Sequence, residues 1–298
     1  MNDNTKKVLV IFDQVATKKQ IRYALHDIID FYTKRGYLVT VCPTTEKKSS
    51  YSIMLQQQEL FDLLICCGGS VALNETVSGM LDSQKDIAIG FLATGMINDF
   101  GRKLGLSQNI GEALETSVNG REDRLDVGMF NDFYFLDTVV FGTFSKTLCA
   151  TSQKPKNIVG SIAYFLEGIR ALSELKAYTL NIKYDNNCIS DNFILGIITN
   201  SLIVSENVEI SKNIEKVNDG IFDMMLIKMP ENINELRAVI TALIGKREDN
   251  RNIIYIKASE IHIDSEMVEW SLDGDFKGYF DKVAISNRHQ AIRMMLPQ

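Results

Sequence analysis

The chain has 298 residues, of which 45% are hydrophobic and 23% are charged, as in a globular protein with room for two domains. The net charge is −6 and the Lys and Arg residues are scattered, so the sequence gives no indication of a nucleic-acid-binding surface. It contains no apolar run of the roughly 18 residues that a membrane span needs. The first residues, MNDNTKKVLV, show no signal-peptide pattern, and five cysteines without metal-like spacing fit a reducing compartment. We therefore expect a cytoplasmic protein.

The first third of the sequence alternates short apolar runs with helical patterns. The apolar runs predict strands over residues 8–12, 37–42, 63–67 and 87–91. The helical patterns predict one helix that ends before Gly36 and others near 51–60, 71–81 and 96–105. Continuous apolar strands separated by amphipathic helices are typical of a parallel sheet covered on both faces. We predict a doubly wound α/β domain over residues 1–122.

The pattern changes after the charged sequence REDR, which we interpret as a linker between domains. Helices are predicted at about 157–175 and 232–244, and short strands at about 178–184, 192–199, 222–228, 253–257, 260–264, 267–272 and 279–285. Many short strands with tight turns favour an antiparallel sandwich or barrel. We predict a β-sandwich domain with a few helices over residues 123–286, while residues 287–298 could return to the first domain.

Two glycines, Gly68 and Gly69, lie where the third predicted strand meets its helix. A strand that leads through two glycines into a helix exposes backbone N–H groups, and the missing Cβ atoms let an anion approach. The turn would lie at the carboxyl ends of the parallel strands, where such sheets bind ligands. A phosphate or a nucleotide is one interpretation, and a tight turn without a ligand is the other.

A second loop repeats this arrangement one strand and helix later. In GFLATGMINDFGRKLGL, a predicted strand is followed by Gly95 and then by Asn98 and Asp99 at the start of a helix. Such side chains also suit the exposed N–H groups of any helix start, and this role is compatible with ligand binding.

These segments resemble the diacylglycerol kinase catalytic family, whose members phosphorylate lipid hydroxyls. CCGGSVALNETVSGM looks like the family's GGDGTxNEVxxG phosphate loop, and GFLATGMINDFGRKLGL is similar to its PxGTxNDFxxxLG stretch. Further along, NIVGSIAYFLEGIRAL, NDGIFDMMLI and SLDGDFKG resemble the family's LGxLAYxLxGLRAL, DDGxLDVxxV and LDGE segments. The segments occur in the family's order over nearly the whole chain.

The resemblance implies an ATP site between the two domains, with Mg²⁺ and a lipid hydroxyl acceptor nearby. It also implies association with the membrane surface and is consistent with a homodimer. The residues that it places at the nucleotide are Gly68, Gly69, Ser70, Asn74, Glu75, Thr94, Gly95, Asn98 and Asp99. Asp99 and Asp219 are implied in the metal-linked network, Asp275 as general base and Asp273 as its support. An Asp-Gly hairpin turn also explains Asp273, and a solvated turn residue is an equal alternative for Asp275.

The sequence departs from the family at its loops. Ser70, Val71 and Ala72 replace the Asp-Gly-Thr of the phosphate loop, so a charge expected to organise Mg²⁺ is missing. Val71 is β-branched and tolerates positive φ poorly, so we expect the loop backbone to differ from the family's. In the second loop, Ala93 and Met96 replace Pro and Thr, and FDQVATKK replaces NPxSG after the first strand.

Three functions remain open from the sequence. The first is an ATP- and Mg²⁺-dependent lipid kinase of the diacylglycerol kinase type. The second is a catalytically impaired relative that binds a nucleotide or a lipid as a sensor or scaffold. The third is a kinase for another alcohol, such as a sphingoid base or a soluble polyol phosphate. NAD kinases use a similar GGDG loop, but the LDGD hairpin and the AYFLEGIRAL helix favour the lipid branch.

Overall fold

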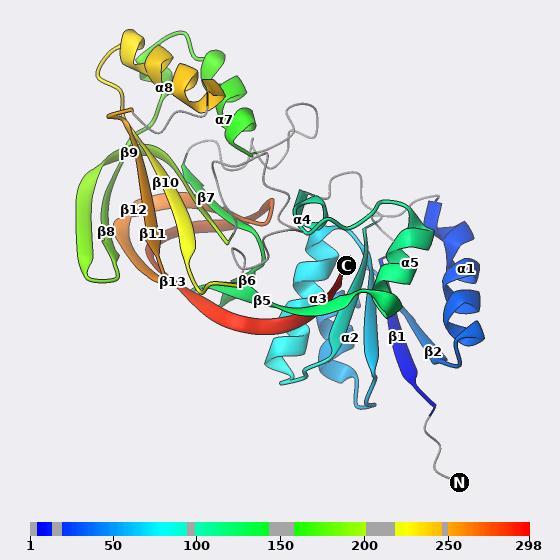
Figure 1. Cartoon of the computed structure of the whole chain (residues 1–298). Coiled ribbons are helices and arrows are strands. Elements are labelled where there is room, and N and C mark those ends of the chain that lie inside the picture. Colours follow the sequence, from blue (N-terminus) through cyan, green and yellow to red (C-terminus); the bar gives the residue numbers. More distant parts are fainter. Residues whose placement is uncertain (1–4, 14–19, 94–98, 143–157, 201–217, 246–249) are drawn as a thin grey trace. The chain divides into compact units, whose positions relative to one another are not determined.

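The fold is mixed α/β with mostly strands, seen in a computed structural model that describes residues 5–13, 20–93, 99–142, 158–200, 218–245 and 250–298 (Figure 1). The chain divides into two compact units. Unit 1 comprises Met1–Asp126, Val208–Asn218 and His289–Gln298, and unit 2 comprises Val127–Asn207 and Asp219–Arg288. None of the described helices is long and apolar enough to cross a membrane.

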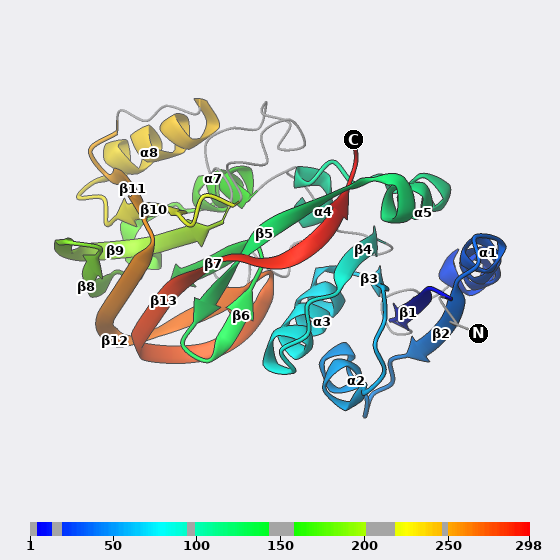
Figure 2. The same ribbon diagram turned by 60° about the horizontal axis from the view of Figure 1, so that its bottom comes forward.

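The sheet of unit 1 is parallel. Its strands are β1 (Lys7–Phe12), β2 (Leu38–Pro43), β3 (Leu63–Gly68) and β4 (Ala88–Ala93), and β3 is fully buried. β1 pairs with β2 and β3, and β3 pairs with β4. The end of the last strand, β13 (Asp275–Leu296), pairs in parallel with β4 through Met294 and Ile89, so the order is β13-β4-β3-β1-β2 (Figure 2).

Helices cover both faces of this sheet. They are α1 (Gln20–Lys34), α2 (Ser50–Gln56), α3 (Ser70–Asp82), α4 (Asp99–Lys103) and α5 (Ile110–Asn119). Cys67 packs in a core with side chains of α1 and α5, whereas the Thr76 hydroxyl of α3 donates to the Sγ atom of Cys66 (3.6 Å). Adjacent strand residues therefore face opposite helix layers, as the doubly wound prediction requires.

Helix α5 was not predicted from the sequence. Asn109 caps it, because the N–H of Glu112 donates to the Asn109 side chain (3.2 Å), and the helix ends at Gly120. The hydroxyls of Tyr32 in α1 and Ser117 in α5 lie 2.6 Å apart in the buried interior, which links the two helices of this face.

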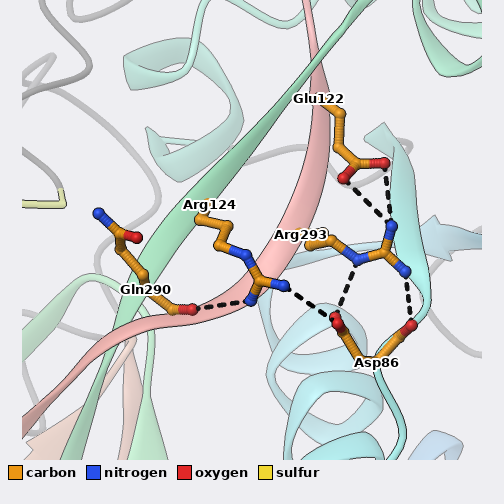
Figure 3. Close-up of polar contacts among 5 residues, drawn as sticks. All are labelled: Asp86, Glu122, Arg124, Gln290 and Arg293. Carbon is orange, nitrogen blue, oxygen red and sulfur yellow. Dashed lines mark hydrogen bonds and ion pairs between the residues drawn. The ribbon is translucent and has the colours of Figure 1, made fainter.

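The predicted REDR linker is wrong, because these residues begin strand β5 (Arg121–Phe130), which pairs with β13. Exposure alternates along this charged segment, and its side chains form ion pairs. Arg293 of β13 donates to Asp86 Oδ1 (2.9 Å) and to both carboxylate oxygens of Glu122 (3.1 Å each), while Arg124 Nη2 lies 3.1 Å from Asp86 Oδ2 (Figure 3). The ion pair between Arg293 and Glu122 stabilises the pairing of β5 with β13 in this charged segment.

Unit 2 is built from antiparallel strands. They are β6 (Phe133–Phe135), β7 (Thr138–Gly142), β8 (Tyr178–Tyr184), β9 (Asn187–Thr199), β10 (Phe222–Lys228), β11 (Ile253–Ala258) and β12 (Glu260–Leu272), with parts of β5 and β13. The long strands β9 and β12 each pair with β8 at one end and with β7 at the other, so these four strands close a ring.

Three helical segments belong to unit 2. They are α7 (Ile158–Glu167), the 3₁₀ helix Leu172–Glu174 and α8 (Ile233–Gly245). The helix predicted at 157–175 is therefore interrupted, because the N–H of Gly168 closes a turn onto the carbonyl of Phe165 (3.0 Å). Side chains of α7 and α8 form one core, and Trp270 with several phenylalanines forms another.

Candidate active site

The two glycines of the β3–α3 turn differ in what surrounds them. A Cβ atom at Gly68 would lie 2.7 Å from Cβ of Ala72 and 3.1 Å from Cβ of Asp13, so close packing excludes a side chain there. A Cβ atom at Gly69 would meet nothing within 4 Å, and the φ of −93° suits any residue. Gly69 caps α3 without a side-chain hydrogen bond, and the space beside its backbone is open.

The three residues that depart from the family loop form the first turn of α3. The helix begins at Ser70, Val71 is 50% exposed, and Ala72 is buried against Gly68. No residue of this turn has a positive φ, so the backbone difficulty expected at Val71 does not arise. This first turn also carries no acidic side chain.

Asn74 and Glu75 lie one turn further along α3. The Ser78 hydroxyl donates to Oδ1 of Asn74 (3.3 Å), and the backbone N–H of Ser50 donates to Oε2 of Glu75 (3.1 Å). The second contact ties α3 to the start of α2. Both side chains therefore have structural contacts. Nucleotide binding by Asn74 and Glu75 stays a prediction.

Asp13 lies beside the glycine turn and was not among the predicted site residues. Its N–H donates to the carbonyl of Cys67 (2.9 Å), and Oδ1 accepts from the Thr44 hydroxyl (3.3 Å). Its other oxygen, Oδ2, lies 3.7 Å from the Cβ position of Gly68. Its place directly after the first strand, at the ligand-binding edge of a parallel sheet, is the signal that could have found it.

The carboxylates near this edge act on a buried thiol. Burial raises the pKa of Cys66 to about 12, the hydrogen bond from Thr76 opposes this shift, and the charges of Asp13 and Glu75 add to it. A thiol with so high a pKa is inert near neutral pH. Cys66 is therefore a packing residue of β3.

Part of the second predicted loop lies outside the described residues, namely Thr94, Gly95 and Asn98. Asp99 is the first residue of α4. Strand β4 ends at Ala93, which pairs with Gly68 in the β3–β4 register. The two strand ends therefore lie side by side, as the sequence predicts.

Asp273 holds the turn between β12 and β13. Its two carboxylate oxygens accept from the backbone N–H groups of Leu136 (2.7 Å), Asp137 (2.9 Å) and Thr138 (2.9 Å). Burial and the nearby charge of Asp137 raise the pKa of Asp273, although the three N–H bonds act in the opposite direction. The positive φ of 48° marks the same residue as a turn position. Its observed contacts are structural.

Asp275 lies at the other end of this turn, and its side chain is 51% exposed. Its Oδ2 accepts from Nζ of Lys277 (2.9 Å), and that ammonium lies 5.8 Å from the ring centroid of Phe133. The structure thus separates the two acids of the LDGD hairpin into one tied to backbone and one reachable from solvent.

Asp219 is also exposed. Its Oδ1 accepts from the N–H of Ile221 (3.0 Å), and Gly220 has a φ of 77°, so this segment is an Asx turn before β10. Within the described ranges, no three His, Cys, Asp or Glu side chains gather in a way that could hold a metal ion. Metal binding by Asp219 and Asp99 stays a prediction.

Comparison with known proteins identifies the family. Residues 7–130 match the model of the diacylglycerol kinase catalytic domain. A relative named diacylglycerol kinase from Staphylococcus aureus (strain MRSA252) is 31% identical over 280 residues, which cover 92% of this chain and 87% of the relative. The chain belongs to the diacylglycerol kinase family. A relative of the same name from Staphylococcus epidermidis (strain ATCC 12228 / FDA PCI 1200) is 30% identical with the same coverage.

Solved structures share the family fold. A crystal structure of a Bacillus anthracis str. Sterne protein has a TM-score of 0.78 at 23% identity and covers 98% of this chain and 97% of that one. A diacylglycerol kinase structure from the same organism gives a TM-score of 0.73 at 20% identity with the same coverage. The predicted family membership is confirmed, and the mixed α/β fold is similar to these structures.

Proposed function

We propose that this protein is an ATP- and Mg²⁺-dependent kinase that phosphorylates the hydroxyl of diacylglycerol or of a similar lipid. Membership of the diacylglycerol kinase family supports lipid kinase activity. The observation that carries the nucleotide part is the open space at Gly69, directly before α3. A helix start with free approach to its backbone N–H groups suits a phosphate. The proposal includes action from the cytoplasm at the membrane surface, and a homodimer stays a prediction.

Mg²⁺ fits the residues beside the turn. It is bound in kinases by one or two carboxylates together with substrate phosphates and water. Asp13 offers one carboxylate beside Gly68, and we propose Asp99 and Asp219 as further members of the metal-linked network. The ion would neutralise phosphate charge, which is the main requirement of phosphoryl transfer. Asp13 then supplies at this edge a negative charge that Ser70 does not have.

Asp275 is the proposed general base. An exposed carboxylate can reach a substrate hydroxyl, whereas the three N–H contacts of Asp273 hold that side chain against the backbone of residues 136–138. In this proposal Asp275 accepts the hydroxyl proton, Lys277 positions the carboxylate, and Asp273 fixes the hairpin that carries both.

Isothermal titration of ATP into the purified protein, with and without Mg²⁺, tests the nucleotide site first. Binding in the micromolar range that depends on Mg²⁺ is expected. A panel of lipids in mixed micelles with labelled ATP then tests transfer. If ATP does not bind under either condition, the proposed kinase function is wrong.

A second candidate function is a sensor or scaffold that binds a nucleotide or lipid without turnover. The lack of an acid in the first turn of α3 favours it. This function predicts thermal stabilisation by ligand without phosphoryl transfer. The double change Ser70→Asp with Val71→Gly is the test, because it restores the missing acid and leaves Ala72, which packs against Gly68, unchanged. A large gain of activity would show that the loop limits the chemistry, and ordinary turnover by the wild type would exclude the sensor.

A further inference from the structure

The side chain of Asp13 lies against the first glycine of the β3–α3 turn. The Cβ atom of Asp13 is 3.1 Å, and its Oδ2 atom is 3.7 Å, from the position that a Cβ atom at Gly68 would occupy. A side chain at Gly68 would therefore crowd Asp13. The missing Cβ atom makes room for a carboxylate one residue before the open backbone of Gly69, where a nucleotide phosphate is proposed to bind.

Asp13 is on the face of the parallel sheet that α3 covers. Phe12, the residue before it, packs in the core with side chains of α1 and α5, so the next residue along the chain points to the other face. The Cβ position of Gly68 agrees with this, because its nearest neighbours are Ala72 of α3 and Asp13. The carboxylate and the start of α3 therefore lie on the same face, at the edge where parallel sheets bind ligands.

Hydrogen bonds fix the direction of this carboxylate. The N–H of Asp13 donates to the carbonyl of Cys67 (2.9 Å), and the N–H of Thr44 donates to the carbonyl of Phe12 (2.8 Å), so both residues continue the sheet pairing beyond the end of β1. The hydroxyl of Thr44, a residue that is 6% exposed, donates to Oδ1 of Asp13 (3.3 Å). With Oδ1 held in this way, Oδ2 is the oxygen on the side of Gly68.

A carboxylate in this place has the same sign of charge as a nucleotide phosphate. Like charges repel, and the repulsion between them is stronger at a half-buried site than in bulk water. A divalent cation removes the repulsion, because Mg²⁺ binds carboxylate and phosphate oxygens together. A phosphate can therefore approach the turn beside Asp13 more easily with a cation than without one.

We propose that Asp13, oriented by Thr44, makes the nucleotide site select the Mg²⁺ complex of ATP over free ATP. Thr44 is a positioning residue, because it acts through Asp13. The inference rests on the proposed kinase function, and it adds the residue that decides in which form the nucleotide binds.

The alternative is a structural role, in which Oδ1 of Asp13 only ties the end of β1 to Thr44 after β2. Asparagine distinguishes the two roles. Its side-chain oxygen can still accept from the Thr44 hydroxyl, whereas an uncharged NH₂ group replaces the oxygen on the side of Gly68. Asp13→Asn therefore removes the charge and keeps the hydrogen bond.

Calorimetric titration of ATP, once with Mg²⁺ and once with EDTA at the same ionic strength, measures this selectivity without any need for turnover. In the wild type we expect Mg²⁺ to raise the affinity for ATP by at least about 100-fold, as the removal of a like-charge contact should. Asp13→Asn should bind free ATP about 10-fold more tightly than the wild type and Mg²⁺-ATP more weakly. The effect of Mg²⁺ on affinity should then fall below about 10-fold. An effect of Mg²⁺ in Asp13→Asn as large as in the wild type would overturn the inference.

Asp62→Asn is the matched control for charge. Asp62 directly precedes β3, at the opposite end of the strand from Gly68, and its Oδ2 accepts from the backbone N–H of Lys7 (2.7 Å). The variant makes the same change of net charge in the same unit, and it should keep the wild-type effect of Mg²⁺. If Asp62→Asn lowers the effect of Mg²⁺ as much as Asp13→Asn does, the general charge of the protein sets the selectivity and the inference is wrong.

The role of Thr44 has its own test. Thr44→Val removes the donor to Oδ1 and should lower the affinity for Mg²⁺-ATP by about 10-fold, whereas Thr44→Ser should keep it. In the Asp13→Asn background, Thr44→Val should not change the effect of Mg²⁺ further. Thr76→Val, which removes a buried hydroxyl that donates to the Ala72 carbonyl (2.7 Å), should change stability alone.

The outcomes separate this inference from the proposed function. A wild type that binds ATP in neither form refutes the kinase function. A wild type that binds Mg²⁺-ATP, with an unchanged effect of Mg²⁺ in Asp13→Asn, refutes only the selectivity of Asp13. Equal losses in Thr44→Val and Thr44→Ser would show that Thr44 acts through packing and not through its hydroxyl. Thermal unfolding of each variant confirms that it is folded, and Asp13→Asn alone decides the selectivity if Thr44→Val does not fold.

Discussion

Gly68 and Gly69 are neighbours in sequence, yet substitution at each should have a different consequence. Gly68→Ala places a methyl group 2.7 Å from Cβ of Ala72, and we expect overpacking of this kind to lower the free energy of unfolding by about 1–3 kcal/mol. Gly69→Ala meets no neighbour within 4 Å, and the poorer helix cap should cost less than about 1 kcal/mol.

The two glycine variants should also differ in nucleotide binding. The methyl group of Gly69→Ala occupies the space where the phosphate is proposed to approach the backbone, so this variant should lose ATP affinity while it stays folded. Urea unfolding and ATP titration of both variants measure the two effects. Wild-type ATP affinity in Gly69→Ala would place the nucleotide elsewhere.

Substitutions of the two acids of the LDGD hairpin, Asp273 and Asp275, should also have different consequences. Asp273→Ala leaves three backbone N–H groups without their acceptor and should lower the free energy of unfolding by more than about 2 kcal/mol. Asp275→Asn alters a half-exposed side chain and should change stability by less than about 0.5 kcal/mol, but it should abolish lipid phosphorylation. Chemical denaturation measures the free energy of unfolding of each variant, and a phosphoryl-transfer assay measures its activity. An active Asp275→Asn enzyme would exclude Asp275 as the base.

The sequence predicts residue types at the site better than their roles. The loop motif indicates Gly68 and Gly69 together. Only folding brings Ala72 and Asp13 against Gly68, and this packing distinguishes Gly68 from Gly69. Asp13 was overlooked because the segment FDQVATKK lacks the family motif, although its position after a strand is informative. Similarly, Oε1 of Glu269 is buried and makes no hydrogen bond with the residues that the structure describes, and no local sequence pattern indicates this burial.

At the scale of elements, the ends of β13 and β5 are held by a charged cluster centred on Arg293 (Figure 3). The hydrogen bond from Arg293, followed by the one from Arg124, lowers the pKa of Asp86. A carboxyl group with a lowered pKa in the folded state stabilises the protein above its unfolded pKa, and this contribution is lost as the pH falls through the folded pKa.

Arg293→Met should therefore reduce stability most near neutral pH. As the pH falls below the unfolded pKa of an aspartate and through the lowered folded pKa of Asp86, the difference between wild type and variant should shrink. High salt should reduce the difference too, because the cluster is partly exposed. Urea unfolding at several pH values and salt concentrations tests this. A difference that is independent of pH would show that Arg293 acts through packing alone.

Local patterns predict some strands of unit 2 to the residue. The predicted strands at 178–184 and 222–228 have the bounds of β8 and β10. The prediction fails where distant segments decide the structure. REDR is a strand because β13 supplies its partners, and β13 itself runs from Asp275 to Leu296, although only residues 279–285 were predicted. Bulges and polar positions interrupt its pattern without ending the strand.

At the scale of the whole molecule, each unit contains an intrinsic probe of its folding. Cys66 and Cys67 are fully buried in unit 1, and burial raises the pKa of both thiols. Trp270 is fully buried in unit 2. In a variant whose other three cysteines are serine, thiol labelling reports unit 1, and tryptophan fluorescence reports unit 2.

We expect the two probes to give one unfolding midpoint in urea. β5 contributes buried Leu125 to unit 1 and buried Phe130 to unit 2, and β13 contributes Met294 and Ile285 in the same way. Loss of either unit therefore removes the continuation of two strands from the other. Two separate midpoints would show that these strands can break at the boundary while one unit stays folded.

The return of His289–Gln298 to unit 1 also affects how the protein is made. The strand that pairs with β4 is translated after the whole of unit 2, so the nascent N-terminal region leaves the ribosome with one edge of its sheet still unpaired. Unpaired sheet edges invite pairing with other chains. During synthesis this edge stays open until residues 289–298 are made, so a ribosome that stalls late in unit 2 would prolong the life of an aggregation-prone form of the chain.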